Sequence, residues 1–379
     1  MYPVGAAATI GELTAEPHPS LARLRAAEPV SWLPVLDGWL VTRHDLAVRV
    51  MRDAGTFTVD DPRFSTATVV GPSMLSLDGA AHTTHRNPFS GYFRPAAVDE
   101  RFGGFVTEQA RLLVERLRQA GQAELRRELA GPLAVAVMAH SLGLPGTAAD
   151  RLLGWYDAIV AAVDGISAGR PPGTAAQTAM GELRKSVEAA VADRRSALLT
   201  GAAATLDLPG VVSNAAVLMF GGIETTEGMT ASAIAHLLGH PDQLALVQAD
   251  RSLLAAAVEE SLRLEPAAAA VDRYATRDVE LGGAAVRAGD LVRVSLTAAN
   301  RDPEVFADPD AFDVRRPDLR KQLAFAYGPH FCLGADLARL QARIATGTVL
   351  DLLPGVRLAG PVRARGLVFR KPVAVDVTW

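Results

Sequence analysis

Apolar and polar residues follow a helical period through the middle of the chain. From about residue 98 to residue 238 most apolar side chains recur three and four positions apart, and one such run, 106–120, stops at Gly121. Residues 208–238 form one long helix candidate that is apolar nearly all round, which is typical of a buried central helix. Shorter helices are predicted at about 44–52, 253–264 and 334–352.

Strand-like sequence lies on either side of this helical region. Segments 30–35 and 38–43 predict a hairpin, 272–296 predicts short strands joined by glycine turns, and 366–379 is strand-like. Residues 56–78 show no sustained period, and irregular stretches of this length are uncommon in compact domains unless they serve a site. We therefore expect a single domain over 1–379, mainly α-helical with small peripheral β-sheets and a long central helix.

Composition narrows the functional classes. The 379 residues are 49% hydrophobic and 21% charged, which is typical of a globular protein. The net charge is −4, so the sequence lacks the excess of basic residues that is typical of nucleic-acid-binding proteins. The N-terminus has no basic segment followed by an apolar run, and no stretch was expected to reach the roughly 20 apolar residues of a membrane span. We expect a cytoplasmic protein that binds neither membrane nor nucleic acid.

The single cysteine, Cys332, lies in the segment "AFAYGPHFCLGADLARL", residues 324–340. A lone cysteine is by default a small buried apolar residue. A structural zinc site would need four ligands, and His330 is the only nearby candidate. A nucleophile paired with His330 would need an orienting acid. The fourth possibility is a metal thiolate at the start of a helix, whose dipole stabilises the anionic sulfur.

This segment resembles the haem-ligand loop of the cytochrome P450 family, Phe-x-x-Gly-x-His/Arg-x-Cys-x-Gly. The matching positions are Phe325, Gly328, His330, Cys332 and Gly334. The resemblance implies that Cys332 ligates the iron of haem b (iron protoporphyrin IX). Two positions depart from the usual pattern. Gln322 stands where many members have a histidine that reaches a haem propionate, and Ala326 replaces a common glycine.

Other family landmarks follow in the expected order. Glu260 and Arg263 resemble the Glu-x-x-Arg pair, and Arg316 is the candidate third member of a charged triad that fixes the cysteine loop. Residues in "DGAAHTTHRNPF" and "DRYATRDVELGG", together with one in the cysteine loop, match the propionate contacts; they are His82, Arg86, Arg273 and His330.

The segment "GGIETTEG" inside the long helix resembles the family's oxygen-activation motif. By that resemblance Glu224 and Thr225 would guide protons to dioxygen, while the small residues Gly221 and Gly222 would leave room for oxygen and substrate. Without the resemblance, Thr225 could equally bond back to a carbonyl one turn earlier and Glu224 could be paired elsewhere.

Together these matches predict a haem-thiolate monooxygenase that uses O2. No flavin domain is apparent, so electrons would come from a separate ferredoxin and ferredoxin reductase, with Arg94, Arg339 and Arg343 as a candidate docking face. A peroxide-using haem-thiolate enzyme and a non-catalytic haem-binding protein are the alternatives. The small or apolar residues Gly222, Ile223 and Ala269 are predicted to line a pocket for a bulky, largely apolar organic substrate of natural-product type.

Overall fold

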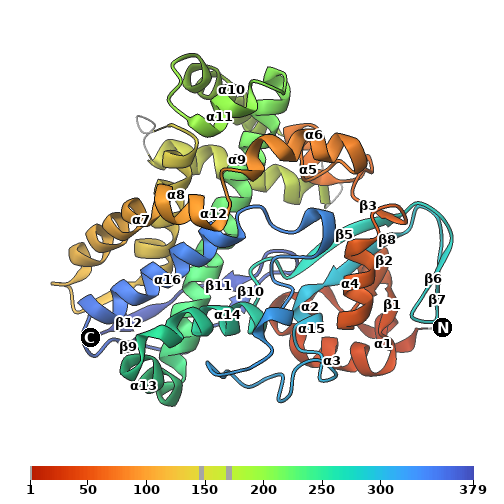
Figure 1. Ribbon diagram of the computed structural model, residues 1–379. Coiled ribbons are helices and arrows are strands. Elements are labelled where there is room, and N and C mark those ends of the chain that lie inside the picture. The colour runs from red at the N-terminus through yellow and green to blue at the C-terminus, as the bar shows by residue number, and fades with distance from the viewer. Residues whose placement is uncertain (1, 145–148, 168–172) are drawn as a thin grey trace. The chain divides into compact units, whose positions relative to one another are not determined.

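The structure is a computed structural model that describes residues 2–144, 149–167 and 173–379. Its contacts group into two compact units. The first comprises Met1–Thr58, Ala110–Ala130 and Thr225–Trp379, and the second comprises Val59–Gln109 and Gly131–Glu224. Helices dominate and the strands form small sheets (Figure 1), which confirms the predicted fold class. The single domain over 1–379 stays a prediction.

The first unit contains a five-stranded sheet in the order β1-β2-β8-β5-β3. Its strands are β1 (Val30–Leu33), β2 (Gly38–Val41), β3 (Phe57–Thr58), β5 (Ala270–Ala275) and β8 (Leu291–Ser295). The predicted hairpin is confirmed, because β1 and β2 pair antiparallel and Asp37 takes the left-handed conformation of a tight turn at φ 47°. β2 pairs parallel to β8, whereas β5 runs antiparallel to β8 and places Arg273 opposite Val292.

Helices and short strands complete the first unit. The helices are α1 (Pro3–Ala7), α2 (Ile10–Ala15), α3 (Pro17–Ala27), α4 (His44–Arg52), α13 (Pro241–Ala249), α14 (Leu254–Leu264), α15 (Leu296–Ala299) and α16 (Ala335–Leu352). The strands are β4 (Gln122–Glu124), β6 (Val279–Leu281), β7 (Ala284–Val286), β9 (Arg357–Leu358), β10 (Ala364–Arg365), β11 (Lys371–Pro372) and β12 (Asp376–Thr378). The segments predicted as helices at 44–52, 253–264 and 334–352 correspond to α4, α14 and α16.

The second unit is built from helices. They are α5 (Ser65–Val70), α6 (Gly79–Ser90), α8 (Gly131–Ser141), α9 (Ala149–Ser167), α10 (Thr174–Ala192) and α11 (Ala197–Ala202). α9 packs against α5, α8 and α10, while α11 packs against α6 and α10. The stretch 56–78 is less irregular than expected, since it contains β3 and the helix α5.

Two helices contribute to both units, α7 (Pro95–Leu117) and α12 (Leu208–Gly239). α12 is the predicted long helix and has 32 residues, so at about 1.5 Å per residue it is roughly 48 Å long. Contrary to expectation, α12 is long and apolar enough to cross a membrane, with a mean hydropathy of 1.2 in its most apolar window. However, 61% of that window is buried within the protein, as in the core helix of a soluble protein.

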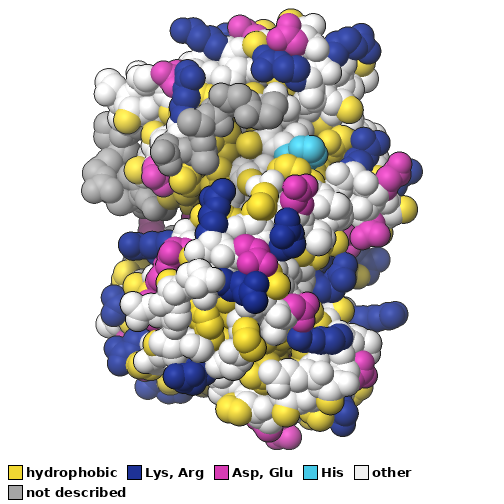
Figure 2. Space-filling model, turned by 90° about the vertical axis from the view of Figure 1, so that its left-hand side faces the viewer, with side chains coloured by type: hydrophobic (Ala, Val, Ile, Leu, Met, Phe, Trp, Pro, Cys, Tyr) yellow, Lys and Arg dark blue, Asp and Glu magenta, His cyan; other side chains and the backbone are white. Residues whose placement is uncertain are grey.

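Charged side chains of both signs cover the surface. Figure 2 shows basic and acidic groups interspersed with apolar ones over one face, without a broad area of a single sign. Such a mixture fits the net charge of −4 and offers no basic stripe on this face for a nucleic-acid backbone.

Candidate functional site

Cys332 lies between a 3₁₀ turn, Gly328–His330, and the start of α16. The side chain is exposed, so the default interpretation of a lone cysteine as a buried packing residue is wrong here. Its backbone N–H donates to the carbonyl of Phe325 across 2.9 Å, which closes the loop on itself. Among the described residues no group of three or more His, Cys, Asp or Glu side chains could hold a metal ion.

Backbone conformation gives this loop its shape. Gly328 has φ 76°, and a Cβ at this position would lie 2.5 Å from the carbonyl oxygen of Met51, so only glycine lets the loop approach the end of α4 this closely. Ala326, the position where the sequence departs from a common glycine, also has a positive φ of 59°. An alanine in this region carries strain of about 1–2 kcal/mol that glycine would avoid.

The loop is anchored in a core shared by three helices of the first unit. Phe325 and Ala324 pack with buried residues of the C-terminal half of α12, of α14 and of α16. Arg339 of α16 lies over the ring of Phe325, 4.4 Å from its centroid, and donates through Nε to Oε1 of Glu259 across 2.6 Å. Although burial opposes its charge, the hydrogen bond and charge of Glu259 raise the pKa of Arg339.

Gln322 is part of the same arrangement. Its amide nitrogen donates to Oε2 of Glu259 across 3.0 Å, and its amide oxygen accepts from the backbone N–H of Ala324 across 2.6 Å. The residue that replaces the usual histidine therefore ties the segment before the cysteine loop to α14.

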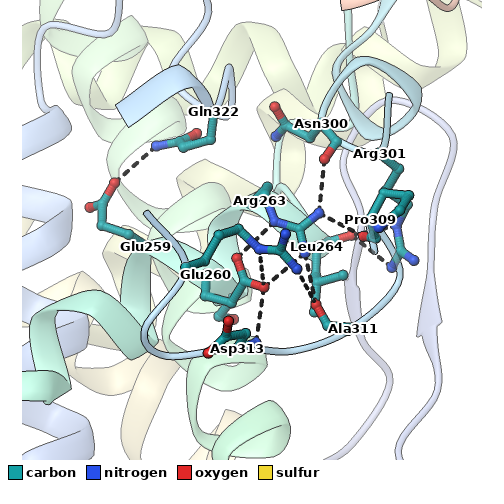
Figure 3. A network of polar contacts seen from close by, with 12 residues as sticks. Glu259, Glu260, Arg263, Leu264, Asn300, Arg301, Pro309, Ala311, Asp313 and Gln322 are labelled. Carbon is teal, nitrogen blue, oxygen red and sulfur yellow. Dashed lines mark hydrogen bonds and ion pairs between the residues drawn. The ribbon is translucent and has the colours of Figure 1, made fainter. Parts of the chain in front are cut away.

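The charged triad expected from the sequence is present and buried, as Figure 3 shows for Glu260 and Arg263. Both of these side chains are 0% exposed and pair at 2.7 Å, and Arg316 donates to the same carboxylate at 2.9 Å. Arg263 also donates to the carbonyls of Asn300, Pro309 and Ala311. The network thereby fixes the chain that leads into the cysteine loop.

The remaining first-unit candidates lie on β5 and in the 3₁₀ turn. Arg273 is 4% exposed and donates through Nη1 to the carbonyl of Asp272 across 2.7 Å. His330 is half-buried two residues before Cys332. Arg273 belongs to a sheet, and His330 to a loop that Phe325 anchors in the core, so both occupy fixed positions in the first unit.

His82 and Arg86 lie in the second unit, one turn apart on α6. His82 is 6% exposed, whereas Arg86 is half-buried. The neighbouring His85 contacts the side-chain amide of Asn214 on α12 at 2.9 Å, which fixes α6 against that helix. The helical spacing places His82 and Arg86 on the same side of α6, as predicted.

The oxygen-activation candidates occupy the centre of α12. Glu224 is 9% exposed and Thr225 is half-buried, whereas the next residue, Thr226, is 3% exposed. Gly221 is exposed, and a Cβ built there would meet nothing within 4 Å. Because residues four apart share a helix face, Gly221 and Thr225 lie on the same side of α12.

Gly222 has a different environment from the one expected. A Cβ on Gly222 would collide with Sδ of Met138 on α8, so this glycine permits close packing of α8 and α12. Room beside the motif comes from Gly221. Ile223 is 1% exposed, and its place in a substrate pocket stays a prediction.

Sequence reasoning missed Glu227, three residues after Glu224. Its carboxylate pairs with Arg126 at 2.8 Å and with Lys371 at 2.7 Å, which fixes the first-unit part of α12 against β11. Glu227 could have been identified from the sequence as a second acidic residue within a largely apolar helix, because a buried carboxylate needs charged or hydrogen-bonding partners.

Ala269, the expected substrate contact, lies just before β5 and is 4% exposed. Its N–H donates to Val368 across 2.7 Å, and its carbonyl accepts from Leu296 across 2.9 Å. The residue lines a small cavity of about 20 Å³ together with Leu13 and Leu21 of the N-terminal helices. Contact with a substrate therefore stays a prediction.

Comparison with known proteins identifies the family. A family model described as cytochrome P450 matches residues 196–352. The cytochrome P450 monooxygenase PikC of Streptomyces venezuelae is 36% identical over 369 residues, which cover 92% of this chain and 86% of that protein. The chain belongs to the cytochrome P450 family. Vitamin D(3) 25-hydroxylase of Pseudonocardia autotrophica is 32% identical to this P450 over 385 residues, 96% of this chain and 93% of the hydroxylase.

Solved structures agree with this assignment. P450BioI, in its complex with an acyl carrier protein ligated to hexadec-9Z-enoic acid, superimposes with a TM-score of 0.88 at 28% identity. The match covers 96% of this P450 and 98% of that chain. The protein is a P450 monooxygenase with haem b as its cofactor.

The residues present suit a haem. The chain's one thiol is exposed just before α16, on a loop whose shape is set by Gly328 and whose Phe325 packs into the core. Arg273 supplies a buried guanidinium in the same unit, and such a group is suited to a carboxylate. Such a donor set would offer one thiolate for iron together with cationic side chains for propionates.

Proposed function

We propose that this P450 inserts one oxygen atom of O2 into a bulky, largely apolar organic molecule in secondary metabolism. The chain, 1–379, would act as one cytoplasmic catalytic domain. The observation that carries the proposal is Cys332, a single exposed thiol on a loop that Phe325 anchors in the core of the first unit. A structural role for that cysteine would call for burial instead.

Each candidate residue receives a role. Cys332 is the thiolate ligand of the iron, and the haem supplies the oxidising chemistry when bound. The propionates are held by cationic or donor side chains, His82, Arg86, Arg273 and His330. Two of these, His82 and Arg273, are almost fully buried, which supports a role in binding carboxylates out of water.

Proton delivery is assigned to Glu224 and Thr225. Hydroxylation with O2 consumes two electrons and two protons and releases one water molecule. The Thr225 hydroxyl would hand on a proton at Oγ1, and the Glu224 carboxyl would replace it. The half-buried position of Thr225, next to the open space at Gly221, supports this role better than the buried Thr226.

Electrons would arrive from a separate ferredoxin reduced by a ferredoxin reductase. Bacterial P450 monooxygenases generally use separate redox partners, O2 and small organic substrates. The names of two similar proteins refer to large apolar molecules, vitamin D(3) in one and a C16 fatty acyl chain in the other. These names support the apolar character of the proposed substrate.

The test of ligation uses Cys332→Ser. The reduced parent with carbon monoxide should show the red-shifted Soret band of thiolate-bound haem, and the variant should lose that band together with oxygenase activity. Thr225→Ala is the matched control and should keep the band. A thiolate spectrum in the serine variant would reject Cys332 as the ligand, and an unaltered spectrum without O2-dependent turnover would favour a peroxide-using or non-catalytic haem protein.

The test of the substrate wall uses Ala269→Phe. If Ala269 lines the pocket, the larger ring should weaken binding of bulky ligands by about 1–3 kcal/mol. Imidazole should still coordinate the iron. Ala285→Phe, at an exposed position on β7, is the control. Equal binding of large and small ligands to both variants would remove Ala269 from the pocket.

A further inference from the structure

A second cavity lies beside α3, at a distance along the sequence from every residue assigned to the haem. It has a volume of about 290 Å³. One face of α3 contributes His18, Ala22 and Arg25, and the opposite wall includes Arg301 and Asp310. All of these residues belong to the first unit. The volume is close to the lower end of the range for small-molecule sites.

Two guanidinium groups form the polar part of the wall. Arg25 is half-buried and donates through Nη1 to the carbonyl of Ala298 across 3.0 Å. Arg301 donates to the carbonyl of Leu264, as Figure 3 shows, and to Oδ1 of Asp310 across 2.5 Å. Burial lowers the pKa of Arg25, and the positive charge of Arg301 lowers it further. The negative charges of Asp302 and Asp310 raise this pKa, but not enough to offset the burial.

His18 also lines the wall of this cavity. Its Nε2 contacts Oε2 of Glu265 at 3.3 Å, whereas Nδ1 is buried with no hydrogen-bond partner in the part of the chain that the structure describes. Burial alone would raise the pKa of Glu265. The hydrogen bond from His18 and the positive charge of Arg370 outweigh this effect and lower the pKa to about 2. A proton on Nε2 lets His18 donate to this ionised carboxylate.

The cavity thus brings together more positive than negative charge. Asp310 is the one carboxylate in its wall, and the Asp310 side chain is 79% exposed, so solvent screens it. The first turn of α3 holds Pro17 and Pro19, which have no N–H to offer a ligand. Recognition would therefore come from side chains, and guanidinium groups are suited to phosphate oxygens.

We propose that this cavity binds a small organic phosphate, a phosphate monoester in chemical class, through Arg25 and Arg301. The phosphate would accept hydrogen bonds from the Arg25 guanidinium and from that of Arg301, whose charge Asp310 already partly neutralises. The rest of the cavity, lined by Leu21, Ala22 and Ala298, accommodates the small organic part of the ligand. The site is independent of the haem and of the monooxygenase substrate.

The experiment is calorimetric titration of the haem-loaded protein with inorganic phosphate, at constant ionic strength maintained with sodium chloride. Saturable binding should appear at phosphate concentrations up to about 10 mM. Arg25→Gln should weaken it about tenfold or more, since a charge-assisted hydrogen bond is lost. Asp310→Asn should tighten it. Arg23→Gln is the matched control, an exposed arginine on α3 outside the cavity lining, and should leave binding unchanged.

A second pair of variants keeps the test decisive if Arg25→Gln fails to fold. Ala22 is an exposed residue in the cavity wall, and Ala22→Glu should abolish phosphate binding by repulsion. Ala26→Glu adds the same charge to an exposed position on α3 outside the cavity lining and should preserve binding. Absence of saturable binding to the parent, or equal effects of Ala22→Glu and Ala26→Glu, would overturn the proposal.

Discussion

Arg339 and Glu259 form an ion pair that joins α16 to α14, with Nε of the arginine 2.6 Å from Oε1 of the carboxylate. The same carboxylate accepts from Gln322, and the guanidinium covers Phe325. The sequence suggested Arg339 as a docking residue for an acidic ferredoxin. The structure also gives it a structural role, because its charge is already paired and its side chain is only 33% exposed.

The first prediction separates docking from structure by charge reversal. Arg343 is exposed one turn further along α16, so Arg343→Glu should slow reduction by an acidic ferredoxin, most strongly at low salt, without changing the melting temperature. Arg339→Glu should lower the melting temperature as well, because it places like charges beside Glu259. Stopped-flow reduction and thermal unfolding report the two effects. Arg357→Glu makes the same charge change at another exposed position and is the control.

The second prediction concerns Thr225 and its neighbour. Thr225→Ala should retain haem and substrate binding but divert electrons to peroxide, because a positioned proton donor is worth about 10²–10⁴ in rate. Thr226→Ala should leave the coupling close to that of the parent, since Thr226 is buried. Product formed per electron consumed is the measurement. If Thr226→Ala uncouples the reaction and Thr225→Ala does not, the two roles are exchanged.

The third prediction follows from the positive φ of Ala326. Ala326→Gly should raise the free energy of unfolding by up to ~1 kcal/mol, as relief of left-handed strain outweighs the greater entropy of the unfolded chain. Ala338→Gly, within α16, should lower it by about 1 kcal/mol. Urea unfolding of the haem-loaded proteins measures both. A decrease for Ala326→Gly would mean that alanine stabilises the loop through packing.

The fourth prediction is a dependence of stability on pH through His236. Burial lowers the pKa of His236 to about 4, and its Nδ1 contacts Oγ of Ser261 at 2.9 Å. Between pH 6.5 and pH 4 the unfolded chain binds a proton at this histidine that the folded chain does not. Stability should therefore fall as the pH decreases through this window, by about 3 kcal/mol at most.

His236→Gln should flatten that part of the profile of unfolding free energy against pH. The loss below pH 4.5 should persist, because the pKa of Glu265 is lowered to about 2 and its ionised form stabilises the fold above that value. His140→Gln, at an exposed position, should keep the profile of the parent. An unchanged slope in His236→Gln would show that His236 does not control this transition.

The sequence was sufficient to predict those structural features that depend on one short segment of the chain. The long apolar helix was predicted from its periodicity, whereas the cysteine loop and the pair of Glu260 with Arg263 were predicted because these short motifs resemble those of a family. Arg316 was placed correctly with Glu260, although they lie 56 residues apart. That prediction came from resemblance to a family, since spacing alone cannot connect two separate segments.

Contacts between distant segments were the part that could not be predicted. Gly221 and Gly222 look equivalent in sequence, yet only Gly222 faces Met138, because the packing of α8 against α12 decides which side of the helix is covered. Likewise Arg339 looked like an exposed cation until Glu259, 80 residues earlier, was brought beside it. The sequence identified the charged and small residues, but the residues that they contact depended on tertiary packing.

From the buried triad we infer an order for the steps of folding. Glu260 and Arg263 share α14, so they can pair as soon as that helix forms, whereas Arg316 reaches the same carboxylate only after the intervening chain has folded back. Closing such a loop is slower than forming a local pair because more chain entropy must be lost. The thiol of Cys332 follows the triad in sequence and would acquire its fixed position late, so the chain presents its iron ligand only after most of the first unit has assembled.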